Sequence, residues 1–405
     1  MNIVVIGGGA AGMTAAITAA GKDKNNKITI IEHGERVGKK ILSTGNGKCN
    51  LTNLHMSPHC FRCDDMRFVK EVLSQFDEKS TLDFFTNLGV MFKIRDGYVY
   101  PYSGQAATIL DALRNAVDSL GIKTLNTENV TDIKPLNPGF EIVLNDRKIM
   151  ADKLIIATGS SASNLKEADD SGYKLVKRLG YRIYKPLPAL TGLKSDNKLC
   201  KVMAGVRCDG RVSLYVDGVL TATDTGEIQL AEYGISGIPV FQVSRYAARA
   251  LYEGKKVKAF VDFMPAFSRE EIVKSFYDKI KNWPGKSMEN QLYGILNKKI
   301  ADAVIKACGF ESVRNKPLCR DKALIIIDKI EEFEFNIKGT SELEKAQICT
   351  GGVLINQIDA RTMESKKHKG LYFAGEILDV DGICGGYNLQ WAWSTGYIAG
   401  RNSVC

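Results

Sequence analysis

The chain has 405 residues, more than a single hydrophobic core usually accommodates, so we expect two or three domains. Its hydrophobic share of 44% and charged share of 25% are ordinary for a soluble globular protein, and no apolar run approaches the roughly eighteen residues of a membrane span. The formal net charge of +9 is dispersed along the chain without a run of five basic residues, so it is interpreted as solvated surface with some attraction for anionic cofactors or substrates, and nucleic acid is a minor option.

The first 32 residues predict a strand, a glycine loop, a helix and a second strand. Gly7, Gly9 and Gly12 have the G-x-G-x-x-G spacing, in which they allow the tight turn, the approach of a pyrophosphate and close packing of helix on strand. Glu32 follows Gly12 by twenty residues, at the end of the second apolar run, where a carboxylate can accept the ribose hydroxyls. The chain is therefore predicted to begin with an adenine-dinucleotide site.

Small polar residues follow this unit in residues 38–53, GKKILSTGNGKCNLTN. Lys40 is suitably placed for a phosphate or a cofactor edge, and Thr44, Gly45 and Asn46 let a backbone approach a ring closely. Cys49 has two interpretations, a buried structural thiol or a thiol near a redox ring, and the sequence favours neither.

One group of residues resembles a metal site and is interpreted as an incidental loop: His55, His59, Cys60 and Cys63. It has a single C-x-x-C and no second ligand pair, so no metal is expected. The ten Cys residues are otherwise scattered, and no leader precedes the strand that starts at Asn2, which together favour a cytoplasmic protein.

Strand patterns dominate the next stretch. Asp96-Gly97 between alternating residues predicts a hairpin, and residues 104–120 have the apolar stripe of a helix. The strand near Val130 is expected to offer its backbone N–H and C=O to an adenine ring. Residues 152–160, DKLIIATGS, then predict a strand that returns to the dinucleotide site through Thr158 and Gly159.

Two prolines near residue 186 predict a linker into a β-rich insertion. The turn Asp217-Gly218 joins two alternating strands, and Ser268 to Glu271 have the capping-box pattern of a helix start. Residues 323–328 and 333–338 are interpreted as strands that return to the insertion. The predicted fold is an α/β Rossmann-like dinucleotide-binding domain (1–187 and 346–405) with an inserted β-barrel-like domain (188–265 and 320–345) that carries a helical subdomain (266–319).

The C-terminal segment 370–400 distinguishes FAD from NAD. It has a strand, Gly375-Glu376, an acidic loop, and Gly385-Gly386 opening a helix whose N-terminus can stabilise negative charge on a reduced flavin. This layout resembles flavoproteins with two dinucleotide-binding motifs.

With the segments 38–53 and 348–353 (ICTGGV), the whole chain resembles the bacterial BaiN/YhiN-type family of FAD-dependent oxidoreductases. That family carries Arg-Cys-Asn where this chain has Lys48-Cys49-Asn50, and Thr where this chain has Cys384.

These patterns give a candidate site. The expected catalytic residues are Asn388, Tyr387 and Cys49. The expected FAD-binding residues are Gly7, Gly9, Ala10, Ala11, Gly12, Glu32, Lys40, Thr44, Gly45, Asn46, Cys49, Asn50, Val130, Thr158, Gly159, Gly375, Glu376, Asp379, Gly385, Gly386, Tyr387, Asn388 and Gln390.

No second G-x-G-x-x-G unit occurs between residues 160 and 370. Either NAD(P)H binds transiently over the flavin, or the substrate reduces the flavin and oxygen reoxidises it. The family resemblance implies the first route, with a conjugated C=C bond of a steroid-like, bile-acid-intermediate-like oxo compound as the small-molecule substrate. A flavin amine oxidase and an FAD-bearing protein that modifies or binds RNA are the alternatives.

Overall fold

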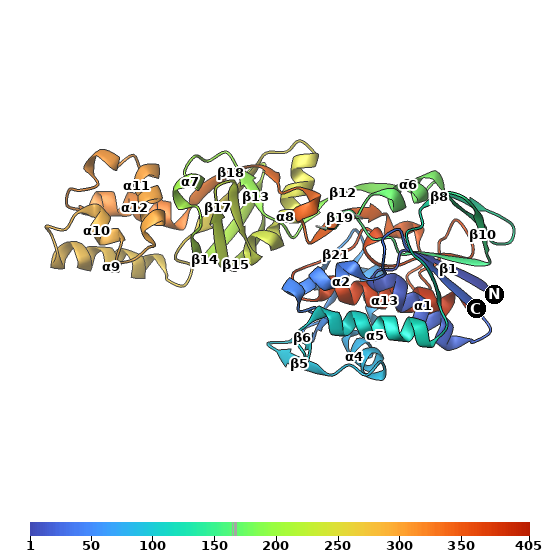
Figure 1. Ribbon diagram of the computed structural model, residues 1–405. Helices are drawn as coiled ribbons and strands as arrows, with labels where there is room; N and C mark the ends of the chain where they lie inside the picture. The colour runs from blue at the N-terminus through green and yellow to red at the C-terminus, as the bar shows by residue number, and fades with distance from the viewer. Residues whose placement is uncertain (164, 166–167) are drawn as a thin grey trace. The chain divides into compact units, whose positions relative to one another are not determined.

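The structure is a computed structural model that describes residues 1–163, 165 and 168–405 (Figure 1). Its contacts divide the chain into two compact units. The first unit is Met1–Leu187 with Leu343–Cys405, and the second is Pro188–Glu342. Both units are built from helices and strands, which confirms the predicted α/β class with an inserted barrel and a helical region. Within the described residues, no helix has both the length and the apolar character that crossing a membrane requires.

A five-stranded parallel sheet forms the centre of the first unit. Its order is β20 (Leu371–Phe373), β11 (Lys153–Ile156), β1 (Asn2–Ile6), β2 (Lys27–Ile31) and β7 (Lys123–Leu125). Val4 pairs with Leu154 on one side and with Thr29 on the other. The three central strands β11, β1 and β2 are rich in β-branched residues and largely buried, as is usual for strands covered on both faces.

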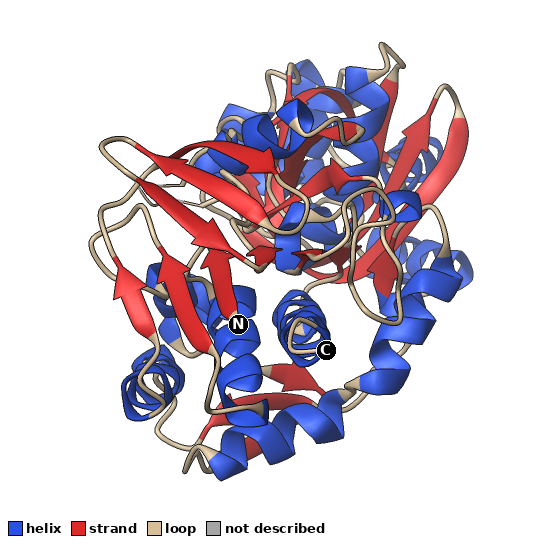
Figure 2. Ribbon diagram, turned by 90° about the vertical axis from the view of Figure 1, so that its right-hand side faces the viewer, coloured by secondary structure: helices blue, strands red, loops and turns tan. Residues whose placement is uncertain are grey.

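Two helices from opposite ends of the chain pack closely in this unit: α1 (Ala10–Lys22) and α13 (Tyr387–Asn402). A Cβ atom built on Gly396 would lie 2.4 Å from the carbonyl oxygen of Ala11, and one on Gly400 would lie 2.2 Å from that of Ala15. Only glycine permits this approach of the two backbones. Figure 2 shows the C-terminal end of α13 beside the start of β1.

Smaller elements surround the sheet. The helices are α2 (Lys39–Ser43), α3 (Met66–Gln75), α4 (Glu78–Asn87), α5 (Ala106–Ser119) and α6 (Ser171–Arg178). The predicted hairpin is confirmed as β5 (Phe92–Arg95) and β6 (Tyr98–Pro101), which pairs with β3 (Thr52–Asn53). The remaining strands form small sheets: β8 (Val130–Pro135), β9 (Phe140–Leu144) and β10 (Lys148–Ala151); β4 (Phe61–Arg62) with β21 (Asp381–Gly382); and β12 (Ile183–Ala189) with β19 (Ile348–Val353).

The second unit contains a closed six-stranded barrel. Its order is β13 (Leu193–Ser195), β16 (Gly234–Gly237), β15 (Val219–Ala231), β14 (Arg207–Val216), β17 (Val257–Asp262) and β18 (Phe333–Thr340), with β18 pairing back to β13. Two helices, α7 (Cys200–Met203) and α8 (Ile238–Tyr252), contact the barrel strands. Alternate residues of β14 and β17 are buried, which fills the barrel interior with aliphatic side chains.

Four helices form the helical subdomain between β17 and β18: α9 (Arg269–Asn282), α10 (Met288–Leu292), α11 (Lys298–Ala307) and α12 (Arg320–Glu331). The capping box at Ser268 and Glu271 is confirmed. The strand predicted at 323–328 is wrong, because this segment lies in α12. Its buried residues Ala323, Ile326, Ile327 and Ile330 have helical spacing, so the helical region continues to Glu331 rather than ending at residue 319.

Candidate functional site

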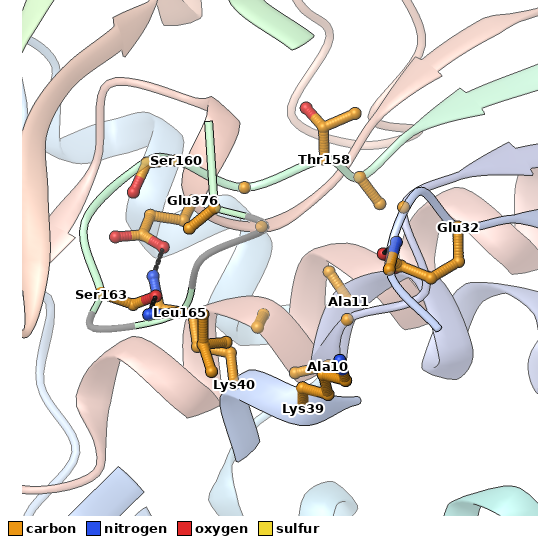
Figure 3. Close-up of a pocket in the computed structure, with 18 of the residues that line it drawn as sticks. Ala10, Ala11, Glu32, Lys39, Lys40, Thr158, Ser160, Ser163, Leu165 and Glu376 are labelled. Carbon is orange, nitrogen blue, oxygen red and sulfur yellow. Dashed lines mark hydrogen bonds and ion pairs between the residues drawn. The ribbon is translucent and has the colours of Figure 1, made fainter. Parts of the chain in front are cut away.

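A cavity lies at the carboxyl ends of β1, β2 and β11, beside the start of α1 (Figure 3). Residues from both ends of the first unit line it, including Glu32, Lys40, Thr158 and Glu376. In Figure 3, Glu32 and Lys40 lie on opposite sides of Ala10 and Ala11. Open parallel sheets bind ligands at this edge, so the topology and the cavity identify the same place.

The three motif glycines have different surroundings. Gly7 has a φ of +101°, and a Cβ there would lie 2.4 Å from the carbonyl oxygen of Ala157; a Cβ on Gly12 would lie 1.9 Å from that of Gly7. Gly9 differs, because a Cβ on it would meet no atom within 4 Å. Gly7 and Gly12 are therefore required by the fold, whereas Gly9 borders open space in the cavity. The first N–H groups of α1 lie here and have no partner within the helix.

Glu32 connects the glycine loop to the turn that follows β2. One carboxylate oxygen accepts the N–H of Gly8 at 2.8 Å, and the other accepts the N–H of Gly34 at 2.7 Å. The ring nitrogen Nδ1 of His33 lies 3.2 Å from the second oxygen. A carboxylate has about four acceptor positions, so these contacts orient Glu32 and leave capacity for a ligand hydroxyl.

Lys40 and Glu376 form an ion pair in the cavity wall, with 2.6 Å between Nζ and Oε2. The other oxygen of Glu376 accepts the N–H of Cys349 at 3.0 Å. The side chains of Lys40 and Glu376 retain 31% and 22% of their exposure, so a ligand can still reach them. The predicted cationic position is thus balanced by a carboxylate 336 residues later in the chain.

Residues at the start of α13 have separate tasks. The Asn388 amide accepts the N–H of Gly382 at 2.8 Å and donates to the carbonyl of Gly382 at 2.9 Å, which fixes β21 to the helix. Gln390 is fully buried and accepts the hydroxyls of Thr52 and Thr81 at 2.6 and 3.0 Å. Asn388 lines the cavity, but Gln390 faces the protein core.

Tyr387 and Cys49, two of the three residues expected to be catalytic, are buried outside the cavity lining. Burial, with a smaller contribution from Cys60, raises the pKa of the Tyr387 phenol, which donates a hydrogen bond to the carbonyl of His55 at 3.4 Å. Burial also raises the pKa of the Cys49 thiol to about 12. Both groups are therefore protonated at neutral pH.

The cavity brings together thirteen of the residues expected to bind cofactor: Gly7, Gly9, Ala10, Ala11, Glu32, Lys40, Thr44, Val130, Thr158, Gly159, Gly375, Glu376 and Asn388. The remaining ones lie outside its lining: Gly12, Gly45, Asn46, Cys49, Asn50, Asp379, Gly385, Gly386, Tyr387 and Gln390. Among the latter, Asp379 is buried and accepts the N–H of Gly351 at 3.0 Å, so it anchors β19.

Sequence reasoning missed several lining residues: Arg36, Ser160, Ser163, Gln347, Leu389 and Ala392. Ser160 could have been found, because it directly follows the Ala-Thr-Gly strand end. Leu389 and Ala392 lie three residues apart on one face of α13, and because both are apolar, nothing in the sequence distinguishes them from ordinary packing residues. Within the described part of the chain, no group of three or more His, Cys, Asp or Glu side chains is placed to hold a metal ion.

A parallel sheet, a glycine loop that opens a helix, and a carboxylate at the end of the second strand define a Rossmann-type dinucleotide-binding protein. The chain belongs to the family described as HI0933-like protein Rossmann domain, which matches residues 1–402, and the predicted BaiN/YhiN-type relationship is thereby confirmed.

Relatives of known activity match nearly the full length of the chain. The chain is 41% identical over 404 residues to a 3-dehydro-bile acid delta(4,6)-reductase of Clostridium scindens, covering 99% of this chain and 98% of that protein. It is 28% identical over 414 residues to a ribosomal RNA dihydrouridine synthase of Escherichia coli, covering 100% and 98%.

Among solved structures, an Escherichia coli quinol fumarate reductase chain matches with a TM-score of 0.50 and 16% identity, over 100% of this chain and 69% of that chain. At this identity the match concerns the fold alone.

Proposed function

We propose that the protein is an FAD-dependent reductase of C=C bonds conjugated to a carbonyl group, acting on small hydrophobic oxo compounds of the steroid type. The 41% identity to a bile-acid reductase, over almost the whole of both chains, carries this proposal. NAD(P)H is the proposed reductant, and the cytoplasm is the proposed location.

FAD is the proposed cofactor because the C-terminal residues Gly375, Glu376 and Asn388 line the cavity together with the N-terminal glycine loop, which gives a wall for the flavin beyond the adenosine and pyrophosphate positions. The proposed order begins with Glu32 at the adenosine ribose, continues with the N-terminus of α1 at the pyrophosphate, and ends with the flavin near Lys40 and Glu376. The open side of Gly9 fits this assignment, since a phosphate could approach the backbone there. Bound FAD would supply the hydride.

The chain's own residues would hold and orient the reacting groups. The hydrogen bonds between the Asn388 side-chain amide and the backbone of Gly382 fix the turn before α13. We propose that this turn presents the N-terminus of the helix to the redox end of the site. Tyr387 keeps its phenolic proton because burial raises its pKa, so we propose that it acts as a hydrogen-bond donor, as it does to the carbonyl of His55, rather than as an acid. Cys49, a neutral thiol at neutral pH, is proposed to pack beneath the site.

The test begins with the identity of the cofactor released by denatured protein, which should be FAD. Under anaerobic conditions NADH or NADPH should bleach the bound flavin, and a steroid-like enone should restore its absorbance in a single turnover. Release of FMN or NAD would overturn the cofactor assignment. Bleaching by an amine, with no response to enones, would support the oxidase alternative instead.

A second candidate substrate is uridine in ribosomal RNA. Two relatives matched over nearly their full length, at 28% and 27% identity, are ribosomal RNA dihydrouridine synthases. The C=C bond of uracil is also conjugated to a carbonyl, so the same hydride chemistry applies. In the single-turnover assay, reoxidation by unmodified ribosomal RNA but not by enones would favour this candidate.

A further inference from the structure

The end of the helical subdomain that lies away from the barrel is strongly basic. Helix α9 starts seven residues after β17 and α12 ends two residues before β18, so the C-terminus of α9 and the N-terminus of α12 lie at the far end (Figure 1). The loops after α9 and before α12 also meet there, because the N–H of Met288 donates to the carbonyl of Lys316 at 2.8 Å. We call this region the basic tip: Lys279, Lys281, Trp283, Lys286, Lys316 and Arg320.

The cations of the basic tip are not neutralised by the protein. Residues 279–322 hold ten Lys or Arg and four Asp or Glu. Three of those acids form ion pairs with cations outside the basic tip. Glu289 and Asp302 pair with Arg314, and Glu311 pairs with Lys306. Among the described residues, no carboxylate forms an ion pair with a cation of the basic tip.

The barrel end of the same subdomain provides a contrast. Arg269, at the start of α9, pairs with Asp328 and Glu331 near the end of α12. At the basic tip, by contrast, like charges lie close together: burial, and then the nearby charge of Lys286, lower the pKa of Lys279. Like charges gathered in this way oppose folding, so a partner of opposite charge would relieve an unfavourable interaction.

Aromatic rings accompany these cations. Trp283 is 51% exposed, and the Lys286 ammonium lies 4.9 Å from the centre of its ring. The Arg320 guanidinium lies 4.8 Å from the centre of the Tyr277 ring. Phosphate-binding cations beside an exposed aromatic face are the combination that proteins use for unpaired bases of RNA.

We propose that the basic tip binds RNA, with its cations on phosphates and Trp283 stacked on an unpaired base. The full-length similarity to two enzymes named for ribosomal RNA favours RNA over other polyanions. The sequence-based interpretation of nucleic acid as a minor option rested on the dispersal of charge along the chain, whereas folding gathers these residues at one end of the helical subdomain. This surface goes beyond the reductase activity and does not depend on which C=C bond is reduced.

The test is fluorescence anisotropy with a labelled RNA hairpin that has an unpaired loop, over a salt series with full-length protein. The triple substitution Lys281→Glu, Lys286→Glu and Lys316→Glu should weaken binding about 100-fold. It should also lower the slope of log K against log salt by about 2 to 3.

The matched control Lys22→Glu, Lys24→Glu and Lys70→Glu changes net charge equally and should alter binding less than about threefold. Trp283→Ala should weaken binding roughly 5- to 100-fold without changing the slope.

Equal losses in the two triple variants would overturn the proposal, since net charge alone would then explain binding. Tighter binding of duplex DNA or of anionic phospholipid vesicles than of the hairpin would also overturn it. Thermal midpoints identify any variant that fails to fold, in which case Trp283→Ala alone decides. Enone-driven flavin reoxidation in the same proteins separates the proposals, because it can persist without RNA binding or fail while RNA binding persists.

Discussion

The two units of this protein differ in how far apart in sequence their contacting segments lie. In the first unit, β1 pairs with β11 about 150 residues later and α1 packs on α13, so both ends of the chain are needed to build the cavity. In the second unit, the barrel is closed by β13 and β18, whose paired residues Leu193 and Thr340 are 147 positions apart, but β14, β15 and β16 follow one another in sequence and α9 to α12 are consecutive. The cavity therefore draws on both ends of the chain, whereas the second unit is built from one continuous segment, Pro188–Glu342.

The helix contacts differ in the same way. Helices α1 and α13 meet through backbone at Gly396 and Gly400, where a single methyl group does not fit. Helices α9 and α12 also contact each other, and their buried residues include large side chains, such as Ile272 and Phe276 of α9 and Ile327 of α12. Where two backbones touch, an added side chain cannot be accommodated by a change of rotamer. Where side chains form the contact, neighbouring side chains can adjust to a small substitution.

The largest effect is expected from Gly396→Ala. The added methyl would lie 2.4 Å from the carbonyl oxygen of Ala11, so α13 must shift, and the free energy of unfolding of the first unit should fall by about 2–3 kcal/mol. The matched control is Gly21→Ala in α1, where a Cβ meets no atom within 4 Å and the change should be neutral or stabilise by up to about 1 kcal/mol. Urea unfolding measures both, and equal effects would contradict the backbone-contact model.

Much of the first unit could be predicted from sequence because its signals are local. The spacing of Gly7, Gly9 and Gly12, followed by Glu32, predicts the loop and the ends of two strands, and both are found. The insertion was predicted from turns and alternation, and the closed barrel confirms its β character. By contrast, the run at 323–328 predicts a strand by composition, but helical spacing of its buried residues decides the structure.

The candidate site was predicted less completely, because tertiary contacts decide where a polar side chain points. Gln390 stands three residues into α13, yet Thr52 and Thr81 hold it in the core. Glu32 is expected from the sequence to accept ribose hydroxyls, and the structure shows that it also accepts two backbone N–H groups. Nothing in the local sequence of Lys40 indicates that Glu376 neutralises it. The pairings of Gln390 and Lys40 arise between segments that meet only after folding.

The next largest effect should come from Glu32→Ala. Loss of the carboxylate leaves the N–H groups of Gly8 and Gly34 without their acceptor and removes the proposed ribose contact, so FAD affinity should fall about 30- to 100-fold. The control is Glu35→Ala, whose side chain is 79% exposed and makes only a 3.5 Å pair with Lys39, and affinity should be unchanged. Titration of apoprotein with FAD measures both affinities; retention of wild-type affinity by Glu32→Ala would remove Glu32 from the proposed site.

A smaller effect, still within the first unit, is expected from Asn388→Ala. It removes the hydrogen bonds that hold Gly382 against α13 and should destabilise the unit by about 1–2 kcal/mol. If this turn orients the redox end of the site as proposed, enone-driven reoxidation should slow about tenfold while FAD stays bound. Asn402→Ala, at the other end of the same helix, removes one bond to the carbonyl of Ile398 and should leave the rate unchanged. A slowed rate in both variants would assign the effect to helix stability rather than to the turn.

The smallest effect should appear in the second unit, with Ser268→Ala. This change removes the hydroxyl that accepts the N–H of Glu271 at the start of α9, and the free energy of unfolding should fall by about 1 kcal/mol. Ser275→Ala on the exposed face of the same helix loses no capping bond and should be neutral or slightly stabilising. Because the cap is a local contact, FAD affinity and the unfolding transition of the first unit should not change in either variant. If Ser268→Ala released FAD, the local character inferred for the second unit would be wrong, and the helical subdomain would have to be counted as part of what supports the cofactor site.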